Sequence, residues 1–227
     1  MLCLVTDRRR LSGADASPGE ARRCLMEQTR YAAAAGIDLI QVRERDLEAA
    51  DLARLVTDLL DAARGTPTRI VVNDRMDVAL ACGADGVHLR ADSVDVADAR
   101  RLAPPGFLIG RSVHHADEAV RAAGADYLMA GTVFPSTSKP DRARWLGAGG
   151  LQEIVRATRT PVLAIGGVTE DRMEEIAATG AAGCAAIGLF LGSGGTGPAR
   201  SCRAIPLQGL VERARSRFDS ADTGSLT

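Results

Sequence analysis

Polar and charged residues follow several short apolar runs of this chain, at points where a core strand would end. The stretch IQVRERD (40–46) places Gln41, Arg43 and Arg45 at alternate positions. Side chains alternate between the two faces of a strand, so these three share one side if the strand continues. Two guanidinium groups beside an amide suit the binding of phosphate or diphosphate. The alternative is a surface ion pair between Arg43 and Glu44, which the alternation disfavours.

Similar groups follow other apolar runs. Asn73 and Asp74 either join such a site or cap the helix expected to begin at Arg75. His88 is interpreted as a hydrogen-bonded core histidine. The remaining groups are Ser112 and His114, the hydroxyls and ammonium of Ser136, Ser138 and Lys139, and the backbone of Gly166 and Gly167. Hydroxyl, ammonium and backbone N–H groups favour anion binding over an ordinary loop.

The elements that must position these groups alternate along the chain. Short apolar runs alternate with amphipathic stretches such as 47–63, a pattern typical of βα units with a parallel sheet. We predict eight strands, near 2–6, 37–43, 69–73, 86–89, 108–112, 127–131, 161–166 and 183–188. An internal echo supports this count: GID (36–38), GAD (83–85), GAD (124–126) and GAA (180–182) each precede an even-numbered strand.

Eight βα units in one domain predict a (β/α)8 barrel, or TIM barrel, over residues 1–218, with its site at the carboxyl ends of the strands. A doubly wound open sheet is the second choice, because no GxGxxG follows the first strand. The Gly-, Ser- and Pro-rich segment 192–206 is predicted to be a flexible connection, and 219–227 a disordered tail.

The composition narrows the class of protein. A net charge of −1 gives no basic field for nucleic acid or anionic membrane, so anion binding must come from local placement. No apolar run approaches about 18 residues, and no signal region opens the chain. We therefore expect a cytoplasmic enzyme acting on small phosphorylated molecules. The sequence does not specify the oligomeric state, and a homo-oligomer is compatible with it.

Six motifs together resemble the thiamine phosphate synthase superfamily, which also contains thiazole tautomerases. They occur in the order and spacing of that superfamily along most of residues 1–190: LVTDR (4–8), QVRERD (41–46), VNDRMDVALACGADGVHL (72–89), IGRSVH (109–114), GTVFPSTSK (131–139) and VLAIGGV (162–168). The combination is specific, although each motif alone is weak.

The resemblance implies a coupling reaction, in which a hydroxymethylpyrimidine diphosphate loses diphosphate to the nitrogen of a thiazole phosphate. It implies Mg²⁺ held by Asp74, and arginines Arg43 and Arg45 around the departing diphosphate. Gln41, Asn73 and Ser112 would position that substrate. The thiazole phosphate would lie against Ser136, Ser138, Lys139, Gly166 and Gly167.

Three positions depart from the synthase pattern. Arg45 stands where a lysine is usual, which changes the donor geometry. The pattern G-Q-[DE]-D reads Arg90-Ala91-Asp92-Ser93, so either Asp92 supplies the second metal carboxylate after a one-residue shift or Mg²⁺ binding is weakened. Gly188 replaces a serine after the last strand, leaving backbone donors for phosphate.

These losses keep two alternatives to the synthase open. In the tautomerases that IGRSVH also resembles, a histidine at the position of His114 moves a proton, and a loop histidine is the other interpretation of that residue. A barrel that binds a thiamine intermediate without catalysis is the third hypothesis. Retention of Gln41, Arg43, Asn73 and Asp74 favours the synthase, because a tautomerase has no diphosphate to hold.

Overall fold

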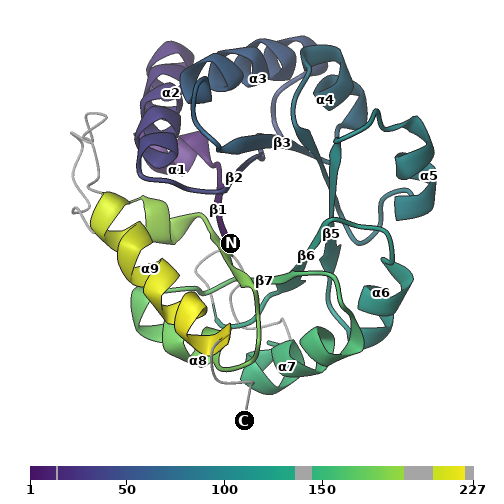
Figure 1. Ribbon diagram of the computed structural model, residues 1–227. Coiled ribbons are helices and arrows are strands. Elements are labelled where there is room, and N and C mark those ends of the chain that lie inside the picture. Colours follow the sequence, from purple (N-terminus) through teal and green to yellow (C-terminus); the bar gives the residue numbers. More distant parts are fainter. Residues whose placement is uncertain (14, 136–144, 192–206, 223–227) are drawn as a thin grey trace.

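Eight parallel strands close into a barrel in the computed structural model, which describes residues 1–13, 15–135, 145–191 and 207–222 (Figure 1). Each strand pairs with the next in the chain, and the last pairs with the first. The strands are β1 (Leu2–Val5), β2 (Leu39–Val42), β3 (Arg69–Asn73), β4 (Gly86–Leu89), β5 (Leu108–Val113), β6 (Tyr127–Gly131), β7 (Val162–Ile165) and β8 (Gly183–Ala186). The predicted (β/α)8 barrel is confirmed, and strand ends differ from the prediction by at most two residues.

Helices surround the barrel (Figure 1). They are α1 (Arg8–Ser12), α2 (Pro18–Ala34), α3 (Ala49–Ala63), α4 (Met76–Cys82), α5 (Val96–Leu102), α6 (Ala116–Arg121), α7 (Gly147–Ala157), α8 (Met173–Ala177) and α9 (Leu207–Asp222), with 3₁₀ turns η1 (Glu170–Arg172) and η2 (Gly188–Phe190). Helix α9 continues to Asp222, so residues 219–222 are helical where a disordered tail was expected. The predicted connection 192–206 and residues 223–227 lie outside the described part. No helix in the described ranges is long and apolar enough to cross a membrane.

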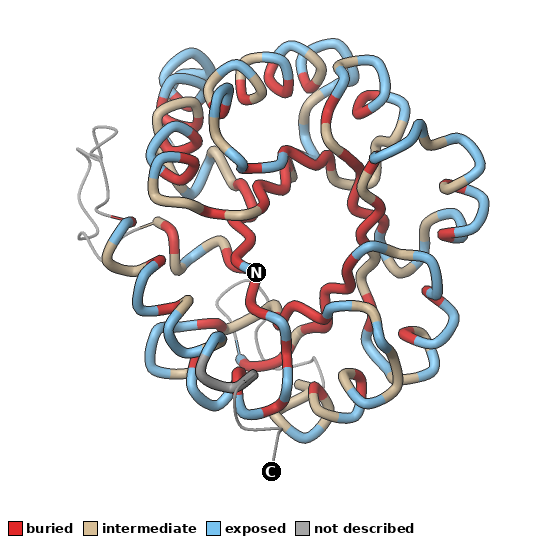
Figure 2. The backbone as a smooth tube through the Cα atoms, viewed as in Figure 1, coloured by how far each residue is buried: buried red, intermediate tan, exposed pale blue. Residues whose placement is uncertain are grey.

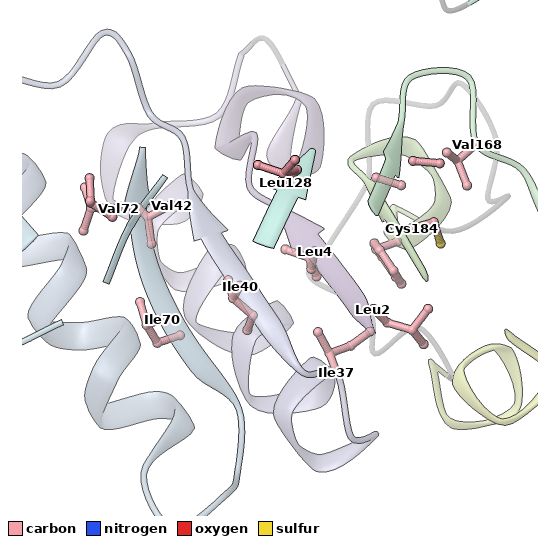
Figure 3. Close-up of a cluster of buried hydrophobic side chains, with 14 of the residues drawn as sticks. Leu2, Leu4, Ile37, Ile40, Val42, Ile70, Val72, Leu128, Val168 and Cys184 are labelled. Atoms are coloured by element: carbon pink, nitrogen blue, oxygen red, sulfur yellow. The ribbon is translucent and has the colours of Figure 1, made fainter. Parts of the chain in front are cut away.

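Strand alternation produces two apolar layers. Side chains such as Leu4, Ile40, Val42, Ile70 and Val72 point outward from the strands and pack under the helices, in the cluster drawn in Figure 3. Side chains at the alternate strand positions point inward and fill the barrel interior. They are Cys3, Val5, Leu39, Val71, Tyr127, Met129, Leu163 and Ala185. Burial is therefore continuous around the strands, as the red ring in Figure 2 shows. Both faces are covered, as parallel sheets require.

The repeated aspartates at the feet of even-numbered strands tie neighbouring strands together. The carboxylates of Asp38, Asp85 and Asp126 accept the backbone N–H of Leu2, Ile70 and Ile109 at 2.7, 2.7 and 2.6 Å. Each aspartate also donates its own N–H to the carbonyl of that same residue. Arg215, Arg69 and Arg100 neutralise the three carboxylates. The echo seen in the sequence is therefore a repeated strand clamp, which Ala182 lacks in the last repeat.

We predict that Asp126→Ala lowers the free energy of unfolding by about 1–3 kcal/mol, because the Ile109 N–H at the start of β5 loses its partner. Asp117→Ala is the matched control, since that exposed carboxylate pairs with Arg121 one helical turn away and should contribute less than about 0.5 kcal/mol. Urea unfolding of both variants measures the difference. Equal losses would contradict the clamp.

Candidate active site

A buried carboxylate lies under the rim formed by the carboxyl ends of β1 and β2. Glu44 is 5% exposed, and its carboxylate accepts the Thr6 hydroxyl at 2.7 Å and the Arg8 guanidinium at 2.8 Å. Arg8 also bonds both oxygens of Asp46 at 2.6 Å. Burial raises the pKa of Glu44, while the hydrogen bonds from Arg8 and Thr6 lower it. Glu44 thus pairs with Arg8, and the ion pair between Arg43 and Glu44 that the strand alternation disfavoured is absent among the described residues.

Arg43, next to Glu44 in the chain, makes no ion pair with any residue that the structure describes. Its backbone N–H bonds the Thr6 hydroxyl at 2.9 Å, but its half-buried guanidinium has no hydrogen bond or ion pair within the described ranges. Burial, followed by the charge of Arg45, lowers the pKa of Arg43, and the charges of Asp7 and Glu44 offset this in part. Strand β2 ends at Val42, so Arg45 lies in the following loop and is exposed, but its charge still reaches Arg43. A half-buried guanidinium that makes no direct ion pair with a described residue is suited to bind an external anion.

Two amides lie next to Arg43 at the rim. Gln41 is 2% exposed and donates its Nε2–H to Oδ1 of Asn73 at 2.9 Å. Its own amide oxygen is buried without a hydrogen-bond partner among the described residues. Because buried polar atoms are rarely left unsatisfied, this oxygen marks a place where a ligand donor can bind.

Three polar side chains form the floor between β4, β5 and β6. The ring nitrogens of buried His88 contact the Tyr127 hydroxyl at 3.2 Å and the Ser112 hydroxyl at 2.9 Å. Gly110 makes this possible, since a Cβ there would lie 2.1 Å from the Tyr127 ring. Burial lowers the pKa of His88 to about 3 and raises that of Tyr127. The interpretation of His88 as a hydrogen-bonded core histidine is confirmed, and Ser112 is held by it.

Asp74 projects from the end of β3 toward the loop after β4. Helix α4 has Arg75 at its N-cap position and no side-chain capping bond, so the capping interpretation of Asn73 and Asp74 is wrong. One Asp74 carboxylate oxygen accepts the Ser93 hydroxyl, and the other pairs with the Arg90 guanidinium at 3.4 Å. Asp92 is 68% exposed and pairs with the same Arg90. Ser93, rather than Asp92, therefore faces Asp74.

Sequence reasoning missed the residue that holds this loop. The guanidinium of Arg111 donates to the backbone carbonyls of Ala91 at 2.9 Å, Val94 at 2.5 Å and Ser93 at 3.4 Å. The Arg111 side chain points outward from β5, away from the barrel interior. No spacing in the sequence connects it with residues 91–94. The Arg8–Glu44 pair was missed for a similar reason, although both residues belong to quoted motifs.

The His114 ring lies at the junction of β5 and β6. Strand β5 ends at Val113, so the strand alternation that would turn His114 inward does not continue, and the residue is exposed. Its Nδ1 nevertheless bonds the carbonyl of Gly131. A carbonyl only accepts, so Nδ1 is the donor in this hydrogen bond.

The last part of the rim is built from backbone. Gly166 and Gly167 have φ of 97° and 64°, and a Cβ at either would lie within 2.5 Å of Thr132 or Pro135. Arg172 donates to the Gly167 carbonyl at 2.9 Å. Gly188 begins η2, beside the side chain of Arg10. The predicted residues Ser136, Ser138 and Lys139 lie outside the described part of the chain.

Fold and rim together define a (β/α)8 barrel whose mouth carries Arg43, which makes no ion pair within the described ranges, and the Gln41 amide oxygen, which has no hydrogen-bond partner there. A sequence model of the family described as thiamine monophosphate synthase matches residues 2–190, and the chain belongs to this family. The resemblance inferred from the six motifs is confirmed.

Relatives and solved structures agree with this membership. The thiamine-phosphate synthase of Methanoregula boonei is 46% identical over 73% of this chain and 78% of its own length. That of Roseiflexus sp. (strain RS-1) is 37% identical over 94% and 88%. A structure of thiamine phosphate pyrophosphorylase from Pyrococcus furiosus is 32% identical, with a TM-score of 0.75, and covers 97% of this chain and 96% of its own.

We predict that the free energy of unfolding depends on pH through His88. Its pKa is about 3 when folded and 6.5 when unperturbed, so the unfolded chain takes up the proton first as pH falls. Stability is therefore lost from about pH 6.5 toward pH 3, and by about 2 kcal/mol between pH 8 and pH 5.

Denaturant unfolding at these two pH values, on wild type and His88→Gln, measures this contribution. The variant should lose about 2 kcal/mol less than wild type on acidification. The exposed His115→Gln is the control and should follow wild type. An unchanged slope in His88→Gln would mean that His88 does not stay neutral in the fold.

Proposed function

We propose that this chain is a thiamine phosphate synthase, a transferase that couples hydroxymethylpyrimidine diphosphate with thiazole phosphate. The products are thiamine phosphate and diphosphate. The observation that carries the proposal is the half-buried Arg43 guanidinium, whose adjacent carboxylate, Glu44, is held by Arg8 instead. Family membership supports the reaction, and such a cation suits a departing diphosphate.

In this reaction the bond between the methylene carbon and the diphosphate oxygen breaks, and that carbon bonds to the thiazole nitrogen. Arg43 and Arg45 stabilise the negative charge that develops on the diphosphate. Gln41 uses its Nε2–H on Asn73, so its open oxygen accepts a donor of the pyrimidine substrate. Asn73 and Ser112 line the same place, with Ser112 oriented by neutral His88.

Mg²⁺ fits this site through Asp74. A carboxylate and the Ser93 hydroxyl are hard oxygen donors, and Mg²⁺ is commonly held by one or two carboxylates together with substrate phosphate and water. Among the described residues no group of three His, Cys, Asp or Glu could hold a metal, so most ligands would come from substrate and water. When bound, Mg²⁺ would supply positive charge to the leaving diphosphate.

The thiazole phosphate is proposed to lie on the opposite part of the rim. In the proposal, the backbone N–H groups of Gly166, Gly167 and Gly188 bind the anion, and Ser136, Ser138 and Lys139 complete this set. The enzyme would act in the cytoplasm on small phosphorylated substrates. Neither nucleic acid nor membrane enters the proposal, and a homo-oligomer is compatible with it.

Thiazole tautomerase is the second candidate function, and the His114 ring favours it. The Gly131 carbonyl holds the hydrogen on Nδ1, so Nε2 is the nitrogen that would exchange a proton with substrate in a general acid–base step. A barrel that binds a thiamine intermediate without turnover is the third. Coupling needs no histidine base, because its driving force is the electrostatic stabilisation of diphosphate.

One set of assays separates the three functions. Purified protein is incubated with both synthase substrates and Mg²⁺, and separately with the tautomerase substrate, and product is followed. We expect thiamine phosphate to form. His114→Ala should leave coupling within about tenfold of wild type, but should reduce tautomerisation by about 10²-fold or more if that were the activity. Binding without either product would support the silent barrel, and the fold of each variant is checked first by circular dichroism.

We predict that Arg43→Ala lowers kcat/KM for the diphosphate substrate by one to two orders of magnitude, because a charge-assisted contact of about 1.5–3 kcal/mol is lost. Arg43→Lys should recover part of it, since charge returns without the guanidinium geometry. Arg64→Ala, an exposed arginine paired with Asp61 at the end of α3, is the control and should match wild type. Steady-state kinetics like those of wild type in Arg43→Ala would exclude its role.

A further inference from the structure

The guanidinium of Arg90 forms an ion pair with Asp74, the carboxylate proposed to hold the metal. Arg90 places Nη1 3.4 Å from Asp74 and its Nη2 on Asp92, so one side chain bridges two carboxylates. Its backbone N–H also bonds the Ser93 hydroxyl at 3.1 Å, and that hydroxyl bonds Asp74. Both oxygens of Asp74 therefore have partners from the loop after β4.

The charge of Arg90 opposes a divalent cation at Asp74. A dication and a guanidinium a few ångströms apart repel each other, and this repulsion remains appreciable where Asp74 is only 28% exposed. Ser93 adds no negative charge to offset it. The carboxylate thus has reduced net charge toward a metal ion until another anion arrives.

Asp92 has a different effect on the same cation. Its carboxylate is 68% exposed and bonds the second guanidinium nitrogen. It can keep Arg90 near the loop when Nη1 leaves Asp74, which makes displacement of Arg90 by a metal easier. Asp92 then acts on metal binding through Arg90.

We propose that Arg90 is a built-in counter-ion of Asp74 that weakens divalent cation binding to the substrate-free protein, and that Asp92 anchors it when it is displaced. The cation then enters chiefly together with the diphosphate, whose negative charge both cations can share. The role of Arg90 in catalysis rests on the proposed function. Its effect on divalent cation binding to the substrate-free protein does not.

The experiment measures binding of Mn²⁺, an oxygen-preferring probe, to the full-length chain without substrate, by the EPR signal of the free ion. Arg90→Gln should tighten Mn²⁺ binding about tenfold, and Asp92→Asn should weaken it several-fold. The double variant should bind within about twofold of Arg90→Gln. Arg75→Gln, which removes the same charge from a residue paired with Asp77, is the control and should bind like wild type.

Two results would overturn the proposal. Unchanged Mn²⁺ affinity in a folded Arg90→Gln protein excludes Arg90 as the counter-ion. A double variant that binds more than tenfold more weakly than Arg90→Gln makes Asp92 a metal ligand instead of an anchor. Should Arg90→Gln fail to fold, unchanged Mn²⁺ affinity in Asp92→Asn would exclude the anchoring role of Asp92. Because no substrate is present, failure of the coupling assay and failure of this proposal are separate results.

Discussion

The buried carboxylate of Glu44 determines the charge of the barrel mouth. Removing a carboxylate from water is costly unless hydrogen bonds and a cation compensate, and here the Thr6 hydroxyl and Arg8 do so. Arg8 follows β1 and Glu44 follows β2, so the pair also joins the first two loops of the rim. Because Arg8 and Thr6 hold the Glu44 carboxylate, the half-buried guanidinium of its neighbour Arg43 makes no ion pair with Glu44 or with any other described residue, although the charges of Asp7 and Glu44 still act on it. The proposed diphosphate site depends on this separation of charges.

The floor of the barrel mouth is uncharged because its histidine, His88, is buried. His88 is enclosed between the hydroxyls of Tyr127 and Ser112, and burial keeps its pKa near 3. A neutral ring adds no charge that would compete with Arg43 for an anion, yet it orients Ser112. The floor positions polar groups, while the arginines at the rim carry the charge.

The loop after β4 is where this chain differs most from the synthase pattern. Arg111 holds the loop carbonyls from outside the barrel, and this places Ser93 and Arg90 against Asp74. Relative to that pattern, Ser93 replaces a carboxylate and Arg90 adds a guanidinium. Both changes make the loop less favourable for a bound cation. In the proposed function, substitutions in this loop would therefore change metal binding independently of the diphosphate contacts proposed at β2.

The sequence by itself determined the barrel, its eight strands and the edge at which Gln41, Arg43, Asn73 and Asp74 gather, because alternation and βα repetition are local patterns. The partners of Glu44 and Asp74 were decided only by the tertiary structure. Arg8 lies 36 residues before Glu44, and Ser93 lies 19 residues after Asp74. The alternation of side chains between the two faces of a strand also gave no valid prediction beyond Val42 and Val113, because β2 and β5 end there. Such pairings form between loops that come together only when the barrel closes. A local periodicity in the sequence does not predict which loops these are.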